Sequence, residues 1–304
     1  MQKKWNNHLG ELLANRNGID VIECECCGFA HIIPLPQVAD KEEFYRNQFY
    51  ETFSDDYIKK HEEDKTWWSI EHNEKYDKFE ELLEDAKTRK SLLDIGSGPG
   101  YFLKTGADRG WHVQGIEPGI SAWQYSHDVL GLNVHHTFLK TENAGTLGTF
   151  DVVHMNNVLE HIVNAAELLS IAYGIVNKGG MISVTVPNDF NRFQEIVSDY
   201  LEKGEWWVSP LQHINYFNCQ SLENLLIKTG FDPIYKTTSF PMELFLLMGD
   251  DYIDNAEIGR KLHTKRKLLE LNMDRSGNTA LKRQLYDIFA GIGLGRQVTV
   301  MARK

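Results

Sequence analysis

The stretch LLDIGSGPG, residues 92–100, decides the fold that this sequence predicts. A short apolar run surrounds Asp94, and three glycines spaced two residues apart follow it. Glycine lets the backbone turn tightly and approach a ligand where a Cβ atom would clash. A dinucleotide-binding loop prefers the spacing G-x-G-x-x-G, but the position of its third glycine is Tyr101 here. The stretch therefore predicts a buried strand that leads into a ligand-binding turn of a different kind.

Carboxylates near the glycine loop indicate which ligand it would bind. Asp94 precedes the loop, where it would repel a pyrophosphate but attract a ligand with an ammonium group. Glu117 ends the next strand about twenty residues further on, and a carboxylate there can accept both hydroxyls of a ribose. The segment FDVVHMNNVLEHI (150–162) adds polar residues at the carboxyl end of a later strand, where ligands of such sheets bind.

Outward from the loop, apolar strands alternate with helices of about a dozen residues. The expected strands are residues 91–95, 112–118, 132–136, 150–155 and 181–187. Such alternation predicts an α/β fold with a Rossmann-like, doubly wound and mostly parallel sheet. Two further strands are expected over residues 231–240 and 297–304, after a segment that reads SPLQHINYF (209–217).

The chain is expected to consist of two parts, an N-terminal extension and the domain that contains this pattern. Residues 1–75 are interpreted as an N-terminal extension with a small cysteine-containing turn and strand followed by helices, and residues 76–304 as the α/β domain. Within that domain, residues 241–291 predict a helical insertion before the last strand. Its first part, PMELFLLMGDDYIDN (241–255), suits a lid or substrate wall, or alternatively a dimer contact.

The composition excludes several classes of partner. The 304 residues carry a net charge of −11, which disfavours the phosphate backbone of a nucleic acid as the main partner. No apolar run approaches the roughly 18 residues that span a bilayer, and the N-terminus lacks the apolar core of a signal peptide. We therefore expect a cytoplasmic monomer or homodimer that binds neither nucleic acid nor membrane.

Three of the four cysteines lie in the sequence ECECCG. Cys24 and Cys27 form a C-x-x-C pair followed by Gly28, the shape of one zinc knuckle. A structural zinc site needs four ligands, and the chain has no second C-x-x-C pair. His8 and His31 could complete a site, but their spacing matches no established pattern. We therefore expect a turn with reduced thiols and no bound metal.

The glycine loop, the acid of the next strand and the FDVV…LEH segment together resemble the class I S-adenosylmethionine-dependent methyltransferases, in order and spacing over about residues 75–240. The CxxCG segment, the PND segment (187–189) and the HINYF segment (213–217) resemble a subgroup often met in sugar and natural-product pathways, which usually begins with two C-x-x-C pairs. The resemblance implies a seven-stranded sheet, S-adenosylmethionine as cofactor and S-adenosylhomocysteine as product.

The resemblance also implies roles for individual residues. The glycine loop would wrap the methionine part of the cofactor, with Asp94 near its ammonium, and Glu117 would hold the ribose. Pro118 and Ile120 would lie against the adenine, with residues 137–140 at its edge. The cofactor-binding residues implied are Asp94, Gly96, Ser97, Gly98, Gly100, Glu117, Pro118, Ile120, Phe138, Leu139, Asn156 and Asn157.

Methyl transfer to a hydroxyl usually needs a base that takes the proton, and histidine suits that role near neutral pH. His213, in the HINYF segment, is our predicted base, and His161 is the second candidate catalytic residue. A histidine buried in a helix-entry loop is the structural alternative for both. Asn215, Tyr216 and Trp207 are predicted to position the acceptor or enclose its pocket.

We therefore expect O-methylation of a small-molecule acceptor: a sugar, a nucleotide-sugar or a related polar metabolite. N-methylation of a small amine is the first alternative, although residues 156–159 read NNVL and so lack the (D/N)-P-P-(Y/F) motif that binds planar amino groups. A cofactor-binding partner protein without catalysis is the second alternative. A nicotinamide oxidoreductase is opposed by Asp94 and by the glycine spacing.

Overall fold

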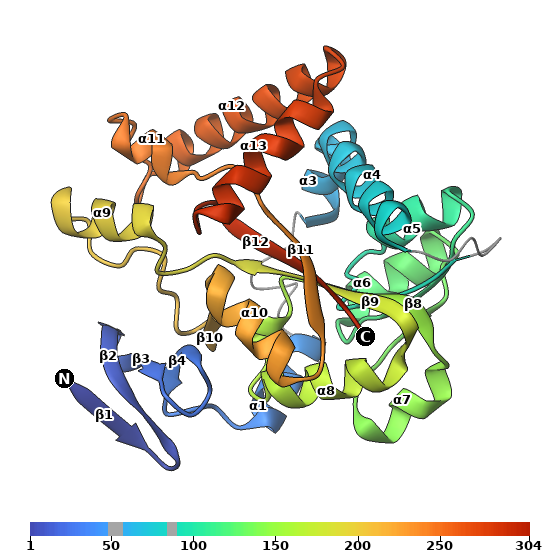
Figure 1. Cartoon of the computed structure of the whole chain (residues 1–304), viewed down its shortest axis with the longest axis horizontal. Helices are drawn as coiled ribbons and strands as arrows, with labels where there is room; N and C mark the ends of the chain where they lie inside the picture. The colour runs from blue at the N-terminus through green and yellow to red at the C-terminus, as the bar shows by residue number, and fades with distance from the viewer. Residues whose placement is uncertain (48–56, 84–89) are drawn as a thin grey trace.

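Strands with apolar residues on both sides form the centre of the fold. The computed structural model describes residues 1–47, 57–83 and 90–304, and its larger sheet has seven strands in the order β11-β12-β9-β8-β5-β6-β7 (Figure 1). These strands are β5 (Ser91–Ile95), β6 (His112–Ile116), β7 (Val134–His135), β8 (Phe150–Asn156), β9 (Val176–Pro187), β11 (Asp232–Thr238) and β12 (Gln297–Arg303). Strands β5 to β9 pair in parallel, whereas β12 is antiparallel to both β9 and β11. The predicted mostly parallel, seven-stranded sheet is confirmed.

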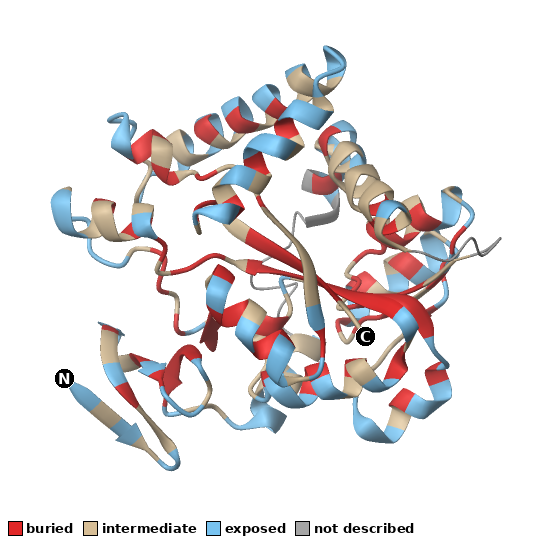
Figure 2. Cartoon of the chain, in the orientation of Figure 1, coloured by how far each residue is buried: buried red, intermediate tan, exposed pale blue. Residues whose placement is uncertain are grey.

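Helices cover both faces of this sheet, because successive residues of a strand point to opposite sides. On one face Leu93 and Val153 pack with side chains of α8 and α10, and on the other Leu92 and Val152 pack with those of α4 and α5. The helices of this part are α4 (Lys65–Leu82), α5 (Tyr101–Asp108), α6 (Ile120–Gln124), α7 (Thr141–Leu147), α8 (Ala165–Ile175), α9 (Arg192–Tyr200) and α10 (Cys219–Lys228). Figure 2 shows buried residues concentrated in the strands between these helical layers.

The N-terminal residues form a second, antiparallel sheet in the order β1-β2-β3-β4-β10. Its strands are β1 (Gln2–Trp5), β2 (His8–Arg16), β3 (Ile19–Cys24), β4 (Phe29–Ile33) and β10 (Asn215–Tyr216). The fifth strand comes from the HINYF segment, which pairs Asn215 with His31 and Tyr216 with Ala30. The sequence predicted only one turn and one strand here, because the charged residues of β1 and β2 concealed two half-exposed strands.

Short helices connect the two sheets. α1 (Val38–Asn47) and α3 (Tyr57–Glu63) follow β4, and residues 48–56, which belong to the predicted N-terminal extension, lie outside the described residues. The next helix, α4, runs across the boundary that we predicted between residues 75 and 76. β10, which belongs to the predicted second part, is also a strand of the small sheet that the predicted first part forms. The two predicted parts are therefore joined by a shared sheet as well as by α4.

Three helices lie between β11 and β12, in the region where the sequence predicted a helical insertion. They are α11 (Glu243–Leu247), α12 (Ala256–Arg275) and α13 (Thr279–Gly291). α12 and α13 lie beside α4 (Figure 1). Lys282 Nζ is 2.8 Å from a Glu74 carboxylate oxygen, and an Arg283 amino nitrogen is 2.9 Å from one of Asp77. These ion pairs join the insertion to α4, and Glu74 and Arg283 also line a cavity described below.

Among the described residues, no helix combines the length and the apolar character needed to cross a bilayer.

Candidate active site

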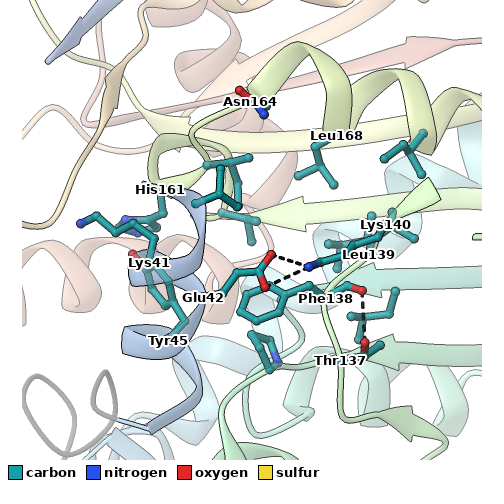
Figure 3. Close-up of a pocket in the computed structure, with 18 of the residues that line it drawn as sticks. Lys41, Glu42, Tyr45, Thr137, Phe138, Leu139, Lys140, His161, Asn164 and Leu168 are labelled. Atoms are coloured by element: carbon teal, nitrogen blue, oxygen red, sulfur yellow. Dashed lines mark hydrogen bonds and ion pairs between the residues drawn. The ribbon is translucent and has the colours of Figure 1, made fainter. Parts of the chain in front are cut away.

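Two cavities open at the carboxyl ends of β5, β6 and β8. The first has a volume of about 380 Å³ and lies between α1 and the segments that follow β6, β7 and β8 (Figure 3). The second, of about 430 Å³, lies between the glycine loop, α4 and the insertion. Gly96, Asn157 and His161 line both cavities, so the two meet at the glycine loop. Both volumes fall within the range of small-molecule sites.

The glycine loop has the backbone geometry that its sequence predicts. Gly96 has a φ of 72°, and a Cβ atom built on it would lie 2.6 Å from Cγ2 of Val158. The Gly96 and Ser97 amides both donate to the carbonyl of Ile116, at 2.8 and 3.0 Å, which holds the loop against β6. Ser97 lines the second cavity, but its hydroxyl oxygen is shielded from solvent and has no hydrogen-bond partner among the described residues. The glycines therefore shape a tight loop where the two cavities meet.

Glu117 joins the glycine loop to the end of β6. Its carboxylate accepts the Gly98 amide at 2.8 Å and the Gly119 amide at 2.7 Å. The residue is only 4% exposed, and it lines the first cavity next to Pro118. Glu117 thus lies where a ribose was predicted to bind, and it also holds the loop in shape.

The remaining wall of the first cavity is largely apolar. Phe138 and Leu139 follow β7 and line it, as the sequence predicted for the adenine site, and α1 contributes Lys41, Glu42 and Tyr45 from the opposite side (Figure 3). Other predicted cofactor residues lie differently: Ser97, Gly98 and Asn156 line only the second cavity, and Gly100 and Ile120 line neither. Gly100 instead caps α5, and Ile120 begins α6 with its side chain 47% exposed.

A buried acid–histidine pair lies beneath the second cavity. Asp94 accepts a hydrogen bond of 2.7 Å from Nδ1 of His154, and both residues are almost fully buried. Burial lowers the pKa of His154, although the neighbouring Asp94 carboxylate opposes that shift. The ring of Phe102 stacks on His154 with centroids 4.1 Å apart. Asp94 is therefore held in one orientation at the edge of the cavity.

Lys75 of α4 is a site residue that our sequence reasoning missed. Its Nζ donates to Asn156 Oδ1 at 3.0 Å and to Thr185 Oγ1 at 3.1 Å, and lies 3.4 Å from His154 Nε2. Burial lowers the pKa of Lys75 to about 8. The signal was present, because Lys75 stands one helical turn before the buried Phe79 and so shares the apolar face of α4.

The two candidate catalytic histidines occupy different positions. His161 lines both cavities and its Nδ1 is 3.0 Å from the carbonyl of Gln212, so the nitrogen that donates is Nδ1. Burial lowers the pKa of His161 to about 4, and therefore the ring is neutral at pH 7. His213 lines neither cavity and packs edge-on against His161, with ring centroids 5.0 Å apart. Glu160 completes the cluster, and burial raises its pKa to about 8.

The three predicted acceptor-binding residues have structural roles instead. Asn215 Nδ2 donates to the carbonyls of Leu159 and Ile162, at 2.9 and 2.8 Å, on either side of the turn that carries His161. The Tyr216 hydroxyl accepts the amide of Ser209 at 3.1 Å. Trp207 is buried in the apolar cluster between the small sheet and the HINYF segment. None of the three lines either cavity, so we reassign Asn215 to holding the turn, Tyr216 to holding the backbone at Ser209 and Trp207 to packing.

Aromatic and charged side chains form the outer wall of the second cavity. The His61 ring stacks between Trp68 and Tyr101, at centroid distances of 5.0 and 3.8 Å. The further lining residues that the sequence did not single out are Trp67, Glu71, His72, Glu74, Lys78, Tyr235, Arg266, Arg283 and Tyr286. They come from α4, β11 and the insertion, which only the folded chain brings together.

A seven-stranded sheet with one antiparallel strand, a glycine loop after strand β5 and an acid after the adjacent β6 define the class I methyltransferase architecture, whose cofactor is S-adenosylmethionine. The chain belongs to the methyltransferase domain family, whose profile matches residues 67–236.

Individual relatives show how far the similarity extends. The ubiquinone biosynthesis O-methyltransferases of Paraburkholderia xenovorans and Aromatoleum aromaticum are 31% identical over 106 residues and 28% identical over 104 residues, each over 33% of this chain. The matches cover 46% and 44% of those proteins, so the chain spans less than half the length of these curated relatives. The crystal structure of a SAM-dependent methyltransferase from Archaeoglobus fulgidus shares the fold, with a TM-score of 0.51 at 17% identity, over 82% of this chain and 99% of that one.

Proposed function

We propose that this protein transfers a methyl group from S-adenosylmethionine to a hydroxyl of a small polar molecule. The observation that carries the proposal is the junction of the two cavities at Gly96, Asn157 and His161. The apolar first cavity suits the adenosine end of the cofactor. The second cavity is lined by Asp94, whose carboxylate suits the ammonium group of its methionine end. The methyl group would then be delivered near His161.

His161 is the base that the geometry favours over His213. It lines both cavities, and its Nδ1–H donates to the Gln212 carbonyl, so Nε2 is the nitrogen with the lone pair. In the proposed step the acceptor hydroxyl gives its proton to Nε2 while its oxygen bonds to the methyl carbon. S-adenosylmethionine would supply that methyl group, with the electron pair of the carbon–sulfur bond going to sulfur, and would leave as S-adenosylhomocysteine. His213 packs behind the His161 ring and would position it.

The lining of the second cavity supports a sugar, a nucleotide-sugar or a related metabolite as the acceptor. The rings of Trp68, Tyr235 and Tyr286 offer flat apolar surfaces against which a sugar ring can pack. Arg266 and Arg283 line the same cavity and would attract a phosphate or carboxylate group, although Arg283 already pairs with Asp77. The similarity to ubiquinone biosynthesis O-methyltransferases also favours a hydroxyl acceptor.

One observation favours an amine acceptor as the second candidate. Glu71 and Glu74 of α4 line the second cavity, and carboxylates there would attract a cationic amine. Burial raises the pKa of Glu74 to about 7, and Lys282 already pairs with both acids. The paired Lys282 reduces the negative charge left for an amine, so we rank this function second.

Calorimetric titration with S-adenosylmethionine, followed by assay of S-adenosylhomocysteine release against a panel of acceptors, tests the proposal. We expect micromolar-range or tighter cofactor binding, lost in Asp94→Ala, and turnover with hydroxylated sugars or nucleotide-sugars. Turnover only with amines would favour the second candidate. Cofactor binding without turnover on any acceptor would indicate a partner protein without catalysis.

A further inference from the structure

Four side chains that could ligate a metal converge at one end of the small sheet. They are His8 from β2, Cys24 from the end of β3, Cys27 from the following turn and His31 from β4. One ligand atom from each lies within 4.8 Å of all the others. We propose that these two cysteines and two histidines bind one structural zinc ion, a site separate from both cavities and independent of the proposed methyl transfer.

The distances between ligand atoms suit a tetrahedral zinc site. His8 Nδ1 lies 3.6 Å from Cys24 Sγ and 3.4 Å from Cys27 Sγ. Bond lengths of about 2.3 Å to sulfur and about 2.0–2.1 Å to nitrogen place neighbouring ligands of a zinc tetrahedron about 3.5–3.6 Å apart. Cys24 and Cys27 are both free thiols, so no disulfide accounts for their approach.

His31 has the orientation of a metal ligand. Its Nδ1 is 2.8 Å from the carbonyl of Ile32, an arrangement that makes Nδ1–H the donor and leaves the lone pair on Nε2. Nε2 has no hydrogen-bond partner among the described residues, although His31 is only 1% exposed. A buried polar atom without a partner is costly. Metal-ligating histidines typically donate their second ring nitrogen to a carbonyl in this way.

The backbone explains how His8 and His31, whose spacing matches no established pattern, come to lie beside the cysteine pair. The Gly28 amide donates to the Cys24 carbonyl at 2.8 Å, and Gly28 adopts a φ of 81°, so the turn folds Cys27 back beside Cys24. The pairing of Gly10 with Cys24 then brings the neighbouring His8 alongside. The second pair of ligands therefore comes from strand pairing rather than from a second C-x-x-C motif.

The zinc would stabilise a sheet whose own apolar core at that end is small. The buried apolar cluster at that end consists, among the described residues, of Ile22, Cys24 and Ile33. Small modules of this kind commonly depend on a metal, because burial alone contributes too little free energy. His31 also pairs with Asn215 across β4 and β10, and Asn215 binds the turn that carries His161. The metal would thus fix the strand that supports the active-site turn.

Metal content per chain tests the proposal, with Cys27→Ser compared with Cys26→Ser as a matched control. Cys26 is exposed and its side chain lies outside the cluster. We expect about one zinc per chain in the wild type and in Cys26→Ser after purification without chelator, and a loss of at least tenfold in Cys27→Ser. Equal zinc loss in both variants, or less than about 0.1 zinc per chain in the wild type, would overturn the proposal.

Cobalt titration of the chelator-treated wild-type protein keeps the test decisive if the serine variant fails to fold. A tetrahedral site with two thiolates gives Co²⁺ intense visible bands and thiolate-to-metal charge-transfer absorption. We expect these bands to saturate at one Co²⁺ per chain and to be displaced by one Zn²⁺. A weak spectrum typical of octahedral oxygen ligands, or no saturation, would refute the site.

Discussion

The neutral state of His161, on which its role as a base depends, predicts a specific loss of stability in acid. The pKa of this histidine falls from 6.5 to about 4 in the folded protein, because the ring is buried. Above pH 6.5 neither state binds the proton, so His161 has no effect there. As pH falls below 6.5, His161 binds a proton in the unfolded chain but not yet in the folded protein, and the free energy of unfolding therefore decreases.

The size of this effect follows from the shift. The free energy of unfolding should fall by about 1.4 kcal/mol per pH unit below 6.5, which is about 2 kcal/mol at pH 5 and about 3.4 kcal/mol once pH is well below 4. The His161 side chain is 14% exposed, so solvent screening reduces these values only modestly. His161→Gln has no proton to bind, and it should therefore lose about 2 kcal/mol less than the wild type between pH 7 and pH 5.

Urea unfolding at pH 7, 6 and 5 measures this difference. His127→Gln is the matched control for replacing one histidine by glutamine, because the side chain of His127 is 52% exposed and lines neither cavity. If the wild type and His161→Gln lose the same free energy to within about 0.5 kcal/mol, His161 is not held neutral by burial. Burial would then no longer explain a neutral His161, and the argument for His161 as the base would fail.

Three further predictions follow from the site. His161→Ala should lower turnover by about 10²-fold or more with little change in cofactor affinity. His213→Ala should lower turnover less than tenfold, because the His213 ring lines neither cavity. Equal losses in the two variants would favour His213 as the base. Glu117→Gln should lower the free energy of unfolding by about 1–3 kcal/mol and weaken cofactor binding, because an amide NH₂ would face one of the two backbone N–H donors. An unchanged thermal unfolding curve would contradict the predicted loss of stability. Gly96→Ala should strongly weaken the cofactor affinity measured by calorimetry. Adding Val158→Ala should restore only the affinity lost through the clash between the new Cβ and Val158, since the left-handed backbone still costs about 1–2 kcal/mol. Complete recovery of affinity would show that backbone strain is unimportant.

The central sheet could be predicted because its signals are local. The buried parts of β5, β8 and β9 are short apolar runs, and the glycines of the loop after β5 adopt positive φ angles, which other residues rarely do. Three residues that line the first cavity could be located in the same way, because Glu117, Phe138 and Leu139 each follow a strand end that the pattern predicts.

The second cavity and the small sheet could not be predicted in this way. Their residues meet only through long-range pairing: Lys75 reaches Thr185, and β4 pairs with β10. SPLQHINYF was interpreted as the rim of a pocket because it follows a sheet strand, but its Asn215 and Tyr216 satisfy backbone groups instead. The prediction failed because a lone sequence does not show which polar atoms already have partners inside the protein.

The pairing of β4 with β10 constrains the order in which this protein can mature on the ribosome. β1 to β4 emerge first, but the outer edge of β4 stays unpaired until the central sheet has been synthesised up to β10. An unpaired edge is open to pairing with other chains during that interval. N-terminal fragments that end before β10 should therefore aggregate, and a circular permutation that brings residues 1–33 after β10 should relieve that exposure during synthesis.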